Sequence, residues 1–406
     1  MKRFNLFCFP GSLKKLCASL RTFGQKPSYI LSAIILSFLV VLPPQPAFTQ
    51  LVKSWENALV LYTLSLDEYL YKNDHTSVTI TSLAISPDSQ TLAIGSHDYE
   101  RSAGNGTSTV SVWNLSTGQM KRILFRGKAG ESFEPSTREP GFSWIGDIVN
   151  TIAFSPDGQT LAAGLSSKTI KLWNWQTGVE IASLKGHTNA VHALTFSPNG
   201  ETLASGSSDT TIKLWNTKRA RLESTLALHK QGVDLLAISP DAQILASKSE
   251  NTIKLWSLAM GKLSRTINDT GETYASNYSL IFSRDGKTLA STCSYSDKKD
   301  TRICLKRWDV ATGRAIPMPG DLTYQPTFNA KDIRASALSP DGQTLVTYVY
   351  IHPKNQVKMW DLLTGRELLT INDPASIPFT FSPDGQIFVV NTNRNNVQVW
   401  VRPKQH

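Results

Sequence analysis

The sequence predicts an all-β protein that is built from seven similar units. A Ser-Pro-Asp-Gly-like turn occurs seven times, a large apolar residue lies six positions after each turn serine, and a tryptophan follows further along every unit. The short segments around these positions alternate apolar and polar residues, and a period of two residues is typical of strands. The turn serines are Ser86, Ser155, Ser197, Ser239, Ser283, Ser339 and Ser382, and the tryptophans are Trp113, Trp173, Trp215, Trp256, Trp308, Trp360 and Trp400.

Each unit is predicted to contain four antiparallel strands. The first precedes the Ser-Pro-Asp-Gly turn, the second follows it, the third ends at the tryptophan, and the fourth follows a short turn, as over 180–184. One such sheet cannot bury both of its faces alone. Stacking seven sheets radially around an axis buries them against one another and leaves only short edges exposed, so we expect a seven-bladed β-propeller of four-stranded antiparallel blades.

The ring is expected to close with a strand from the N-terminal side. The last unit stops after its third strand, because the chain ends just past Trp400. Residues 59–66 (Leu-Val-Leu-Tyr-Thr-Leu-Ser-Leu) resemble the fourth strands and precede the first unit. Pairing this segment with the last unit would supply the missing strand and complete the seventh blade.

The charge of the chain does not indicate a nucleic-acid partner. Of the 406 residues, 40% are hydrophobic and 18% are charged, which is typical of a globular protein. The formal net charge is +10, but the first 50 residues hold six basic side chains and no acidic one. Subtracting them from 42 basic residues leaves 36 against 32 acidic ones, a balance of +4 over the remainder. We therefore expect no basic domain.

The N-terminal leader predicts export. Basic residues are followed by an apolar run from Ile30 to Leu42, then by prolines and small residues. Thirteen helical residues span roughly 20 Å, short of the ~30 Å hydrocarbon core of a bilayer and typical of a secretory signal peptide. We expect a leader over 1–49, a linker over 50–57 and the propeller over 58–403, in a periplasmic or other extracytoplasmic compartment. The alternative is an uncleaved membrane anchor formed by the apolar run.

The third unit carries the fullest set of further marks. They are Gly186-His187, Leu203-Ala204-Ser205-Gly206-Ser207, Asp209 and Trp215-Asn216. Together with the seven spaced turns, they resemble the WD-repeat β-propeller family over about 59–403, in a bacterial-type form with an export signal or anchor. The resemblance implies a structural hydrogen-bonded set within the blade, made by His187, Ser205 or Ser207, Asp209 and Trp215.

Other units depart from this pattern. Ser167 stands in place of the loop aspartate in the second unit, Glu250 replaces it conservatively in the fourth, and Val401 follows Trp400 in the last. Blades that lack the full set are expected to be held less firmly.

Loop lengths vary on one face of the expected ring. The spacing across the Ser-Pro-Asp-Gly turn and across the turn after the tryptophan is constant, whereas the other two connections vary widely and emerge on the opposite face. Binding residues concentrate in such loops on a rigid scaffold. The insertions over 127–147 and 97–109 are expected to lie side by side and either to fold back onto the rim or to form an anchor patch for a protein partner. The candidates for that patch are Tyr99, Arg101, Phe133, Arg138, Phe142 and Trp144.

These observations favour a non-enzymatic scaffold, as a monomeric propeller, that binds a protein partner through its variable-loop face. No catalytic, cofactor-binding or metal-binding residue is predicted, since the seven histidines show no metal-ligand spacing and no nucleophile motif stands out. Two alternatives stay open. One is a propeller enzyme, such as a hydrolase or lyase, with its site at the central funnel. The other is a structural module of the envelope that contacts the membrane only through an uncleaved leader.

The two cysteines outside the leader, Cys293 and Cys304, both fall in the fifth unit. Aligned on the turn, Cys293 matches Ser207, and aligned on the tryptophan, Cys304 matches Thr211; these two positions should face each other across a hairpin. Opposed strand residues have Cβ atoms ~4.5–5.5 Å apart, near the ~3.5–4.5 Å that a disulfide requires. An exported protein meets an oxidising environment, so we expect a disulfide, with two separate buried thiols as the alternative.

Overall fold

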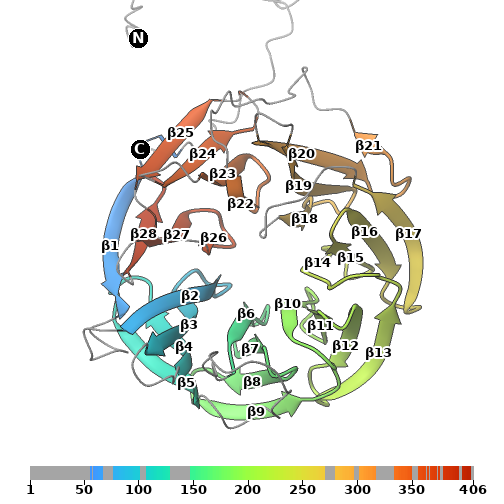
Figure 1. Ribbon diagram of the computed structural model, residues 1–406, viewed down its shortest axis with the longest axis horizontal. Helices are drawn as coiled ribbons and strands as arrows, with labels where there is room; N and C mark the ends of the chain where they lie inside the picture. Colours follow the sequence, from blue (N-terminus) through green and yellow to red (C-terminus); the bar gives the residue numbers. More distant parts are fainter. Residues whose placement is uncertain are drawn as a thin grey trace, which may run out of the picture. The chain divides into compact units, whose positions relative to one another are not determined.

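The computed structural model contains seven four-stranded antiparallel sheets arranged in a ring, which confirms the predicted seven-bladed β-propeller (Figure 1). All described residues belong to the compact unit Lys53–His406. They are 55–56, 58–66, 76–100, 107–128, 147–269, 279–296, 301–316, 333–349, 355–362, 364, 366–372, 374, 378–392 and 396–403. The backbone alone is described at 76–77, 99–100, 128, 293–296, 301–305 and 333–334.

The blades follow one another along the chain, and the four strands of each blade lie in order from the central axis to the rim (Figure 1). Blades 1 to 4 comprise β2 (Thr76–Ile85), β3 (Thr91–Glu100), β4 (Thr107–Asn114) and β5 (Met120–Lys128); β6 (Val149–Phe154), β7 (Thr160–Leu165), β8 (Ile170–Asn174) and β9 (Val179–Leu184); β10 (Val191–Phe196), β11 (Thr202–Ser207), β12 (Thr211–Asn216) and β13 (Arg221–Ala227); and β14 (Leu235–Ile238), β15 (Ile244–Ser249), β16 (Thr252–Ser257) and β17 (Lys262–Asn268). Blades 5 to 7 comprise β18 (Leu280–Phe282), β19 (Thr288–Ser296), β20 (Thr301–Asp309) and β21 (Ala315–Ile316); β22 (Ile333–Leu338), β23 (Thr344–Val349), β24 (Gln356–Asp361) and β25 (Glu367–Asn372); and β26 (Phe379–Phe381), β27 (Ile387–Thr392), β28 (Asn396–Val401) and β1 (Leu59–Ser65).

The last blade is completed by the first strand of the ring, as the sequence predicts. β1 pairs antiparallel with β28, from Leu59↔Val401 to Ser65↔Asn396. The Tyr62 hydroxyl donates a hydrogen bond to the Leu115 carbonyl of blade 1, so β1 also ties blade 7 to its neighbour. Because the first and last strands of the ring share one sheet, the ring is closed by hydrogen bonds rather than by side-chain packing alone.

Trp55 is part of the ring core, although residues 50–57 are expected from the sequence to form a linker. Its side chain is 0% exposed. It lies edge-on to Phe381 and Phe388, with ring centroids 5.8 Å and 6.2 Å away, and the Arg402 guanidinium lies 5.5 Å from its ring centroid. Residues 55–56 and 58–66, which we call the N-terminal strap, therefore contact the ring both ahead of β1, through Trp55, and along β1 itself.

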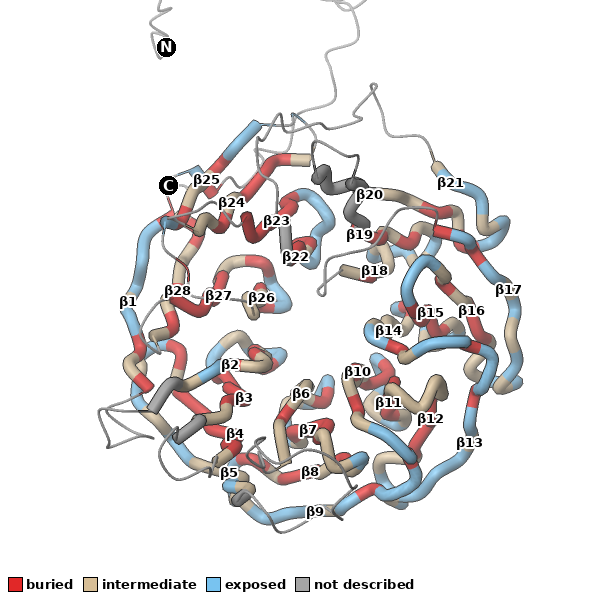
Figure 2. The backbone as a smooth tube through the Cα atoms, viewed as in Figure 1, coloured by how far each residue is buried: buried red, intermediate tan, exposed pale blue. Residues whose placement is uncertain are grey.

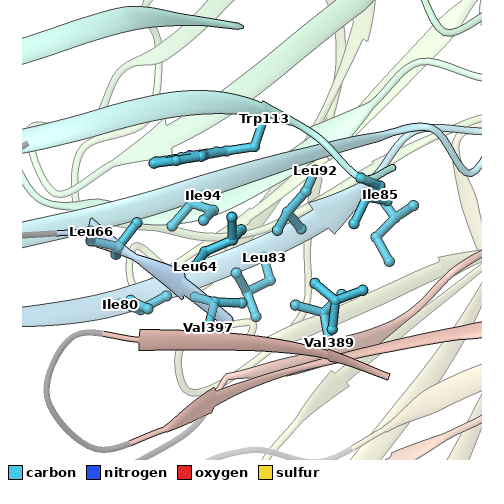
Figure 3. Packing of buried hydrophobic residues seen from close by; sticks show 12 residues of the cluster. Leu64, Leu66, Ile80, Leu83, Ile85, Leu92, Ile94, Trp113, Val389 and Val397 are labelled. Atoms are coloured by element: carbon cyan, nitrogen blue, oxygen red, sulfur yellow. The ribbon is translucent and has the colours of Figure 1, made fainter. Parts of the chain in front are cut away.

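A buried hydrophobic cluster lies at every junction between neighbouring blades. In the cluster between blades 7 and 1, Leu64 and Leu66 pack with Ile80 and Trp113 of blade 1 and Val397 of blade 7 (Figure 3). The outermost strands are the most exposed part of the ring (Figure 2). Since burying a large aliphatic side chain stabilises a fold by about 1.5–3 kcal/mol, these seven clusters hold the blades against one another.

Glycines in the second strands of blades 1 to 3 permit a close approach of the next blade. A Cβ atom at Gly206 would lie 2.8 Å from Cγ1 of Val233, and one at Gly164 would lie 2.7 Å from Cγ1 of Val191. Such distances are too short for a side chain, so only glycine fits there without a shift. In blade 4 this position is occupied by Lys248, which forms a buried ion pair with Asp269 beside the hydrophobic cluster of this junction.

The expected leader over 1–49 lies outside the described residues, and so does the apolar run from Ile30 to Leu42. In the described part of the chain, no helix is long and apolar enough to span a bilayer.

Candidate functional site

The connections of each blade emerge on two opposite faces of the ring. The turn face carries the connections from first to second strand and from third to fourth strand. The variable-loop face carries those from second to third strand and from one blade to the next. On the turn face, the connection from first to second strand always has five residues, and the connection from third to fourth strand has four or five. On the variable-loop face they have two to six residues within a blade and six to twenty between blades.

The constant turns are locked by their own hydrogen bonds. In blade 3, Ser197 Oγ donates to Asn199 Oδ1 at 2.6 Å and accepts the Thr202 N–H at 2.9 Å, while Gly200 adopts a φ of +71°. In the other six turns an aspartate takes the place of Asn199 and accepts from its own turn serine. The uniformity of this face therefore has a structural cause, which leaves the variable-loop face as the candidate binding surface.

Blade 3 contains a continuous hydrogen-bonded set that includes residues of its loops on the variable-loop face. Trp215 Nε1–H donates to Ser205 Oγ at 2.8 Å, Ser205 Oγ lies 2.7 Å from His187 Nε2, and His187 Nδ1 lies 2.7 Å from Asp209 Oδ2. Asp209 also accepts the N–H groups of Thr188 and Thr211 at 2.9 Å. The set links the loop before blade 3, its second strand, its second loop and its third strand, so it fixes both loops of this blade.

Burial and hydrogen bonding set the charges in this group. Burial lowers the pKa of His187, and the bond to Asp209 offsets only part of this effect, so the imidazole is neutral at pH 7. Burial alone would raise the pKa of Asp209, but bonds from Thr211, Thr188 and His187 outweigh it and lower this pKa to about 2. The neutral imidazole therefore donates through Nδ1–H to the carboxylate and accepts the Ser205 hydroxyl at Nε2.

Blade 4 keeps part of this set. His229 Nε2 lies 2.7 Å from Ser247 Oγ, and Trp256 Nε1–H donates to the same oxygen at 2.8 Å. Burial, with the nearby Lys254, lowers the pKa of His229 to about 4. Glu250, at the sequence position of Asp209, is exposed and is not among the groups that shift this pKa. A glutamate there does not replace the aspartate in function.

The predicted anchor patch falls largely outside the described residues. Arg101, Phe133, Arg138, Phe142 and Trp144 all lie there. The backbone of Tyr99 is in β3, opposite Ser77, and its side chain is not described. Much of the insertion over 97–109 continues the β3–β4 hairpin, which still pairs at His97↔Ser108. The patch therefore stays a prediction.

Sequence reasoning missed a set of polar residues at the variable-loop end of the innermost strands. Asn150, His192 and Asp234 occupy aligned positions, each directly after a buried valine. The pairing register shifts at the first two of them, and such bulges commonly re-aim a side chain next to functional sites. The signal that could have found them is this recurring pair of a buried valine and a variable polar residue.

These inner residues contact their surroundings in different ways. Asn150 Nδ2 donates to the Val191 carbonyl of the next blade at 3.1 Å, and His192 Nε2 lies 2.7 Å from Ser208 Oγ. Burial, with the charge of Glu250, raises the pKa of Asp234. Among the described side chains, no group of three or more His, Cys, Asp or Glu is placed to hold a metal ion. This inner rim therefore carries hydrogen-bonding side chains at the variable-loop side of the ring.

Comparison with known proteins identifies repeats in the first four blades. The model of the WD domain, G-beta repeat, matches residues 68–100, 140–174, 178–216 and 220–257.

Several curated proteins are similar to short stretches of the chain. A stretch of 68 residues is 40% identical to nuclear distribution protein nudF of Aspergillus flavus, covering 17% of this chain and 15% of that protein. A stretch of 114 residues is 30% identical to U3 small nucleolar RNA-interacting protein 2 of Mus musculus, covering 28% and 21%. A stretch of 45 residues is 49% identical to nuclear distribution protein PAC1 of Ajellomyces capsulatus, covering 11% and 10%. The chain thus spans about a fifth or less of the length of these relatives.

All three relatives come from eukaryotes, and the bacterial-type form and the export signal expected from the sequence stay predictions. The fold and the matched repeats lead to one conclusion: this chain is a seven-bladed β-propeller that carries four WD repeats, in blades 1 to 4.

Proposed function

We propose that this chain is a non-enzymatic extracytoplasmic scaffold that binds a protein partner through its variable-loop face. The observation that carries the proposal is the contrast between the two faces. Turns of constant length are locked by internal hydrogen bonds on one face, and connections of two to twenty residues cover the other. Variable loops on a rigid scaffold are where binding residues concentrate. The closed ring and the hydrogen-bonded set around His187 supply that rigidity.

A protein partner is favoured over a nucleic acid by the charge distribution. The name of one relative describes an RNA-interacting protein, but outside its first 50 residues this chain carries 36 basic against 32 acidic side chains. Nucleic-acid binding depends on many clustered Lys and Arg contacts to phosphates, and a balance of +4 spread over seven blades does not supply them.

The extracytoplasmic location is supported by the leader. A basic flank, a short apolar run from Ile30 to Leu42 and small residues after it are the features of a signal peptide.

Site-specific photocrosslinking tests the binding face. Lys230 lies in the connection between blades 3 and 4 on the variable-loop face, and Lys218 lies in the turn between β12 and β13 on the turn face; both are exposed. A photoreactive residue at each position in the full chain, in the cells that produce it, gives a matched pair. We expect a discrete protein adduct at Lys230 that is at least tenfold weaker at Lys218. Equal labelling at both positions, or labelling at Lys218 alone, would contradict the assignment of the face.

Two further variants separate the alternatives. Replacing 129–146 with a short Gly-Ser link should remove the adduct if the predicted anchor patch carries binding. The enzyme alternative is tested with Ser208→Ala, because Ser208 and His192 form a hydroxyl–imidazole pair at the inner rim. Hydrolysis of a model ester that is present in the full chain and lost in this variant would favour an enzyme over a scaffold.

A further inference from the structure

The two cysteines of blade 5 are direct cross-strand partners. β19 and β20 pair without a register shift from Thr288↔Asp309 to Ser296↔Thr301, and Cys293↔Cys304 is one of these pairs. In blade 3 the corresponding pairing of β11 with β12 ends at Gly206↔Ile212. In blade 5 the pair Thr292↔Leu305 corresponds to this end, and the cysteine pair follows directly after it. The blade 5 hairpin therefore continues three pairs beyond its cysteines, on the variable-loop side.

Directly opposed positions in an antiparallel pair share one face of the sheet, with Cβ atoms ~4.5–5.5 Å apart. A disulfide needs a Cβ separation of ~3.5–4.5 Å, so a small closing movement of the two strands brings the positions within reach. A shift of one residue in either strand would place the two cysteines on opposite faces, where no bond can form. The observed register is the one that permits a bond.

We propose that Cys293 and Cys304 form a disulfide that closes the β19–β20 hairpin and makes the pairs beyond it a rigid projection of the variable-loop face. The oxidant is a small disulfide such as oxidised glutathione. The thiolate of one cysteine attacks it and releases one glutathione thiolate; the other cysteine, as its thiolate, attacks the mixed disulfide and releases the second. Two cysteine thiols are oxidised to one disulfide, one glutathione disulfide is reduced to two thiols, and the protons lost by the cysteines are taken up by the glutathione thiolates.

The bond would keep the hairpin tip closed, which the backbone hydrogen bonds of the hairpin alone do not do. It closes a loop over 293–304, which restricts the open conformations of the hairpin tip. A pre-ordered loop loses less entropy when a partner binds it. This disulfide goes beyond the proposed binding function, because its formation needs no partner. It rests on the proposed extracytoplasmic location, where the environment is oxidising.

The test is the thiol state of the full chain at equilibrium with a mixture of oxidised and reduced glutathione. After alkylation and digestion, mass spectrometry separates the 293–304 link from any link of Cys8 or Cys17. The matched control is the double variant Cys293→Ser/Ser294→Cys. It has the same composition, but its cysteine lies on the other face of β19, opposite Ile303. We expect more than about 90% linked peptide in the unaltered chain and less than about 10% in the control. Hydrogen exchange of the amides in 294–303 should be at least tenfold faster in Cys293→Ser.

Two results would overturn the inference. One is a pair of free thiols in the unaltered chain at equilibrium, and the other is a bond that forms equally in the register control. The proposed location is tested separately, by blocking thiols in the cells before isolation. If the bond forms with glutathione but the protein from cells carries free thiols, the disulfide inference stands and the proposed extracytoplasmic location is contradicted.

Discussion

The Nζ atom of Lys248 lies 2.6 Å from the Oδ2 atom of Asp269, and the two side chains are 2% and 0% exposed. Lys248 belongs to blade 4, and Asp269 directly follows the last strand of that blade, at the start of the connection to blade 5. Asp269 also accepts from Ser291 Oγ at 3.2 Å and pairs with Lys306 Nζ at 2.9 Å. Since Ser291 in turn holds Trp308 Nε1 at 3.0 Å, Asp269 occupies the place that His187 has in blade 3. A buried charge cluster thus joins blades 4 and 5.

Removing one member of this pair should destabilise the ring more than removing both. Asp269→Asn leaves the buried ammonium of Lys248 without its counter-charge, so we expect a loss of about 3–5 kcal/mol in the free energy of unfolding. The double variant Lys248→Met/Asp269→Leu carries neither the buried charge nor its desolvation cost, and it should lose less. Urea unfolding of the two variants and the unaltered chain measures this. A double variant that loses as much free energy of unfolding as Asp269→Asn, or more, would contradict this account of the buried charge.

The stability of the ring should fall as the pH drops from about 6.5 to about 4. The pKa of His229 is lowered to about 4 in the folded chain by burial and by Lys254, against its ordinary value of 6.5. Between these values the unfolded chain binds more protons than the folded one, so protonation favours unfolding. A shift of this size corresponds to roughly 3 kcal/mol, which is lost in full below pH 4. Denaturant titrations across this range should show a smaller loss in His229→Gln, and an equal loss would assign the acid sensitivity to other groups.

The hydrogen-bonded set of blade 3 makes a further prediction. Ser205→Ala leaves the buried Nε1–H of Trp215 and the Nε2 of His187 without their shared partner, so we expect a loss of about 1–3 kcal/mol in unfolding free energy. Ser183→Ala is the control, because Ser183 is exposed in β9 and its loss should cost within about 0.5 kcal/mol. Thermal unfolding monitored by tryptophan fluorescence compares the two. Similar melting temperatures would mean that Trp215 is held by packing alone.

The ring could be predicted from the sequence because its marks are local and recur in every blade. Leu59 to Leu66 was recognisable as a strand because it resembles the other outer strands, and β1 spans Leu59–Ser65. Trp55 had no such signal: its partners, Phe381 and Phe388, are more than 300 residues away and no periodic pattern joins them.

The polar contacts between blades could not be predicted for a related reason. Lys248 lies in blade 4 and Asp269 in the connection to blade 5, and alignment of the units shows each of them only as a departure from the residue usual at its position. The inner strands shift register at Asn150 and His192, and the sequence pattern does not reveal these shifts. The recurring valine before Asn150, His192 and Asp234 marks their positions but not their contacts. The contacts of residues that differ from unit to unit can be assigned only when the positions of neighbouring blades are known.

Cleavage of the leader is expected near Thr49–Gln50. Small residues at Ala47 and Thr49 follow the apolar run, as a signal-peptide cleavage site requires. A chain beginning at Gln50 keeps the whole N-terminal strap, so processing should leave the ring intact. N-terminal sequencing of the mature protein checks the site, and Ala47→Arg/Thr49→Arg is the variant expected to block it. The full chain recovered from the membrane in the unaltered protein would favour the anchor alternative.

Deletion of 59–66 should open the ring. β28 would lose its outer partner, and the cluster between blades 7 and 1 would lose Leu64 and Leu66, which are 4% and 0% exposed. We expect a loss of several kcal/mol in unfolding free energy, because each of these leucines contributes about 1.5–3 kcal/mol and the pairing of β1 is lost as well. The exposed edge of β28 is also a template for pairing between molecules, so the truncated protein should aggregate.

A point variant separates this effect from the loss of one contact. Tyr62→Phe removes the hydrogen bond to Leu115 and leaves the β1–β28 pairing in place, so it should cost about 1 kcal/mol and cause no aggregation. Differential scanning calorimetry with light scattering distinguishes the two outcomes. A truncated protein that keeps its melting temperature and stays monomeric would show that β1 does not hold the ring closed.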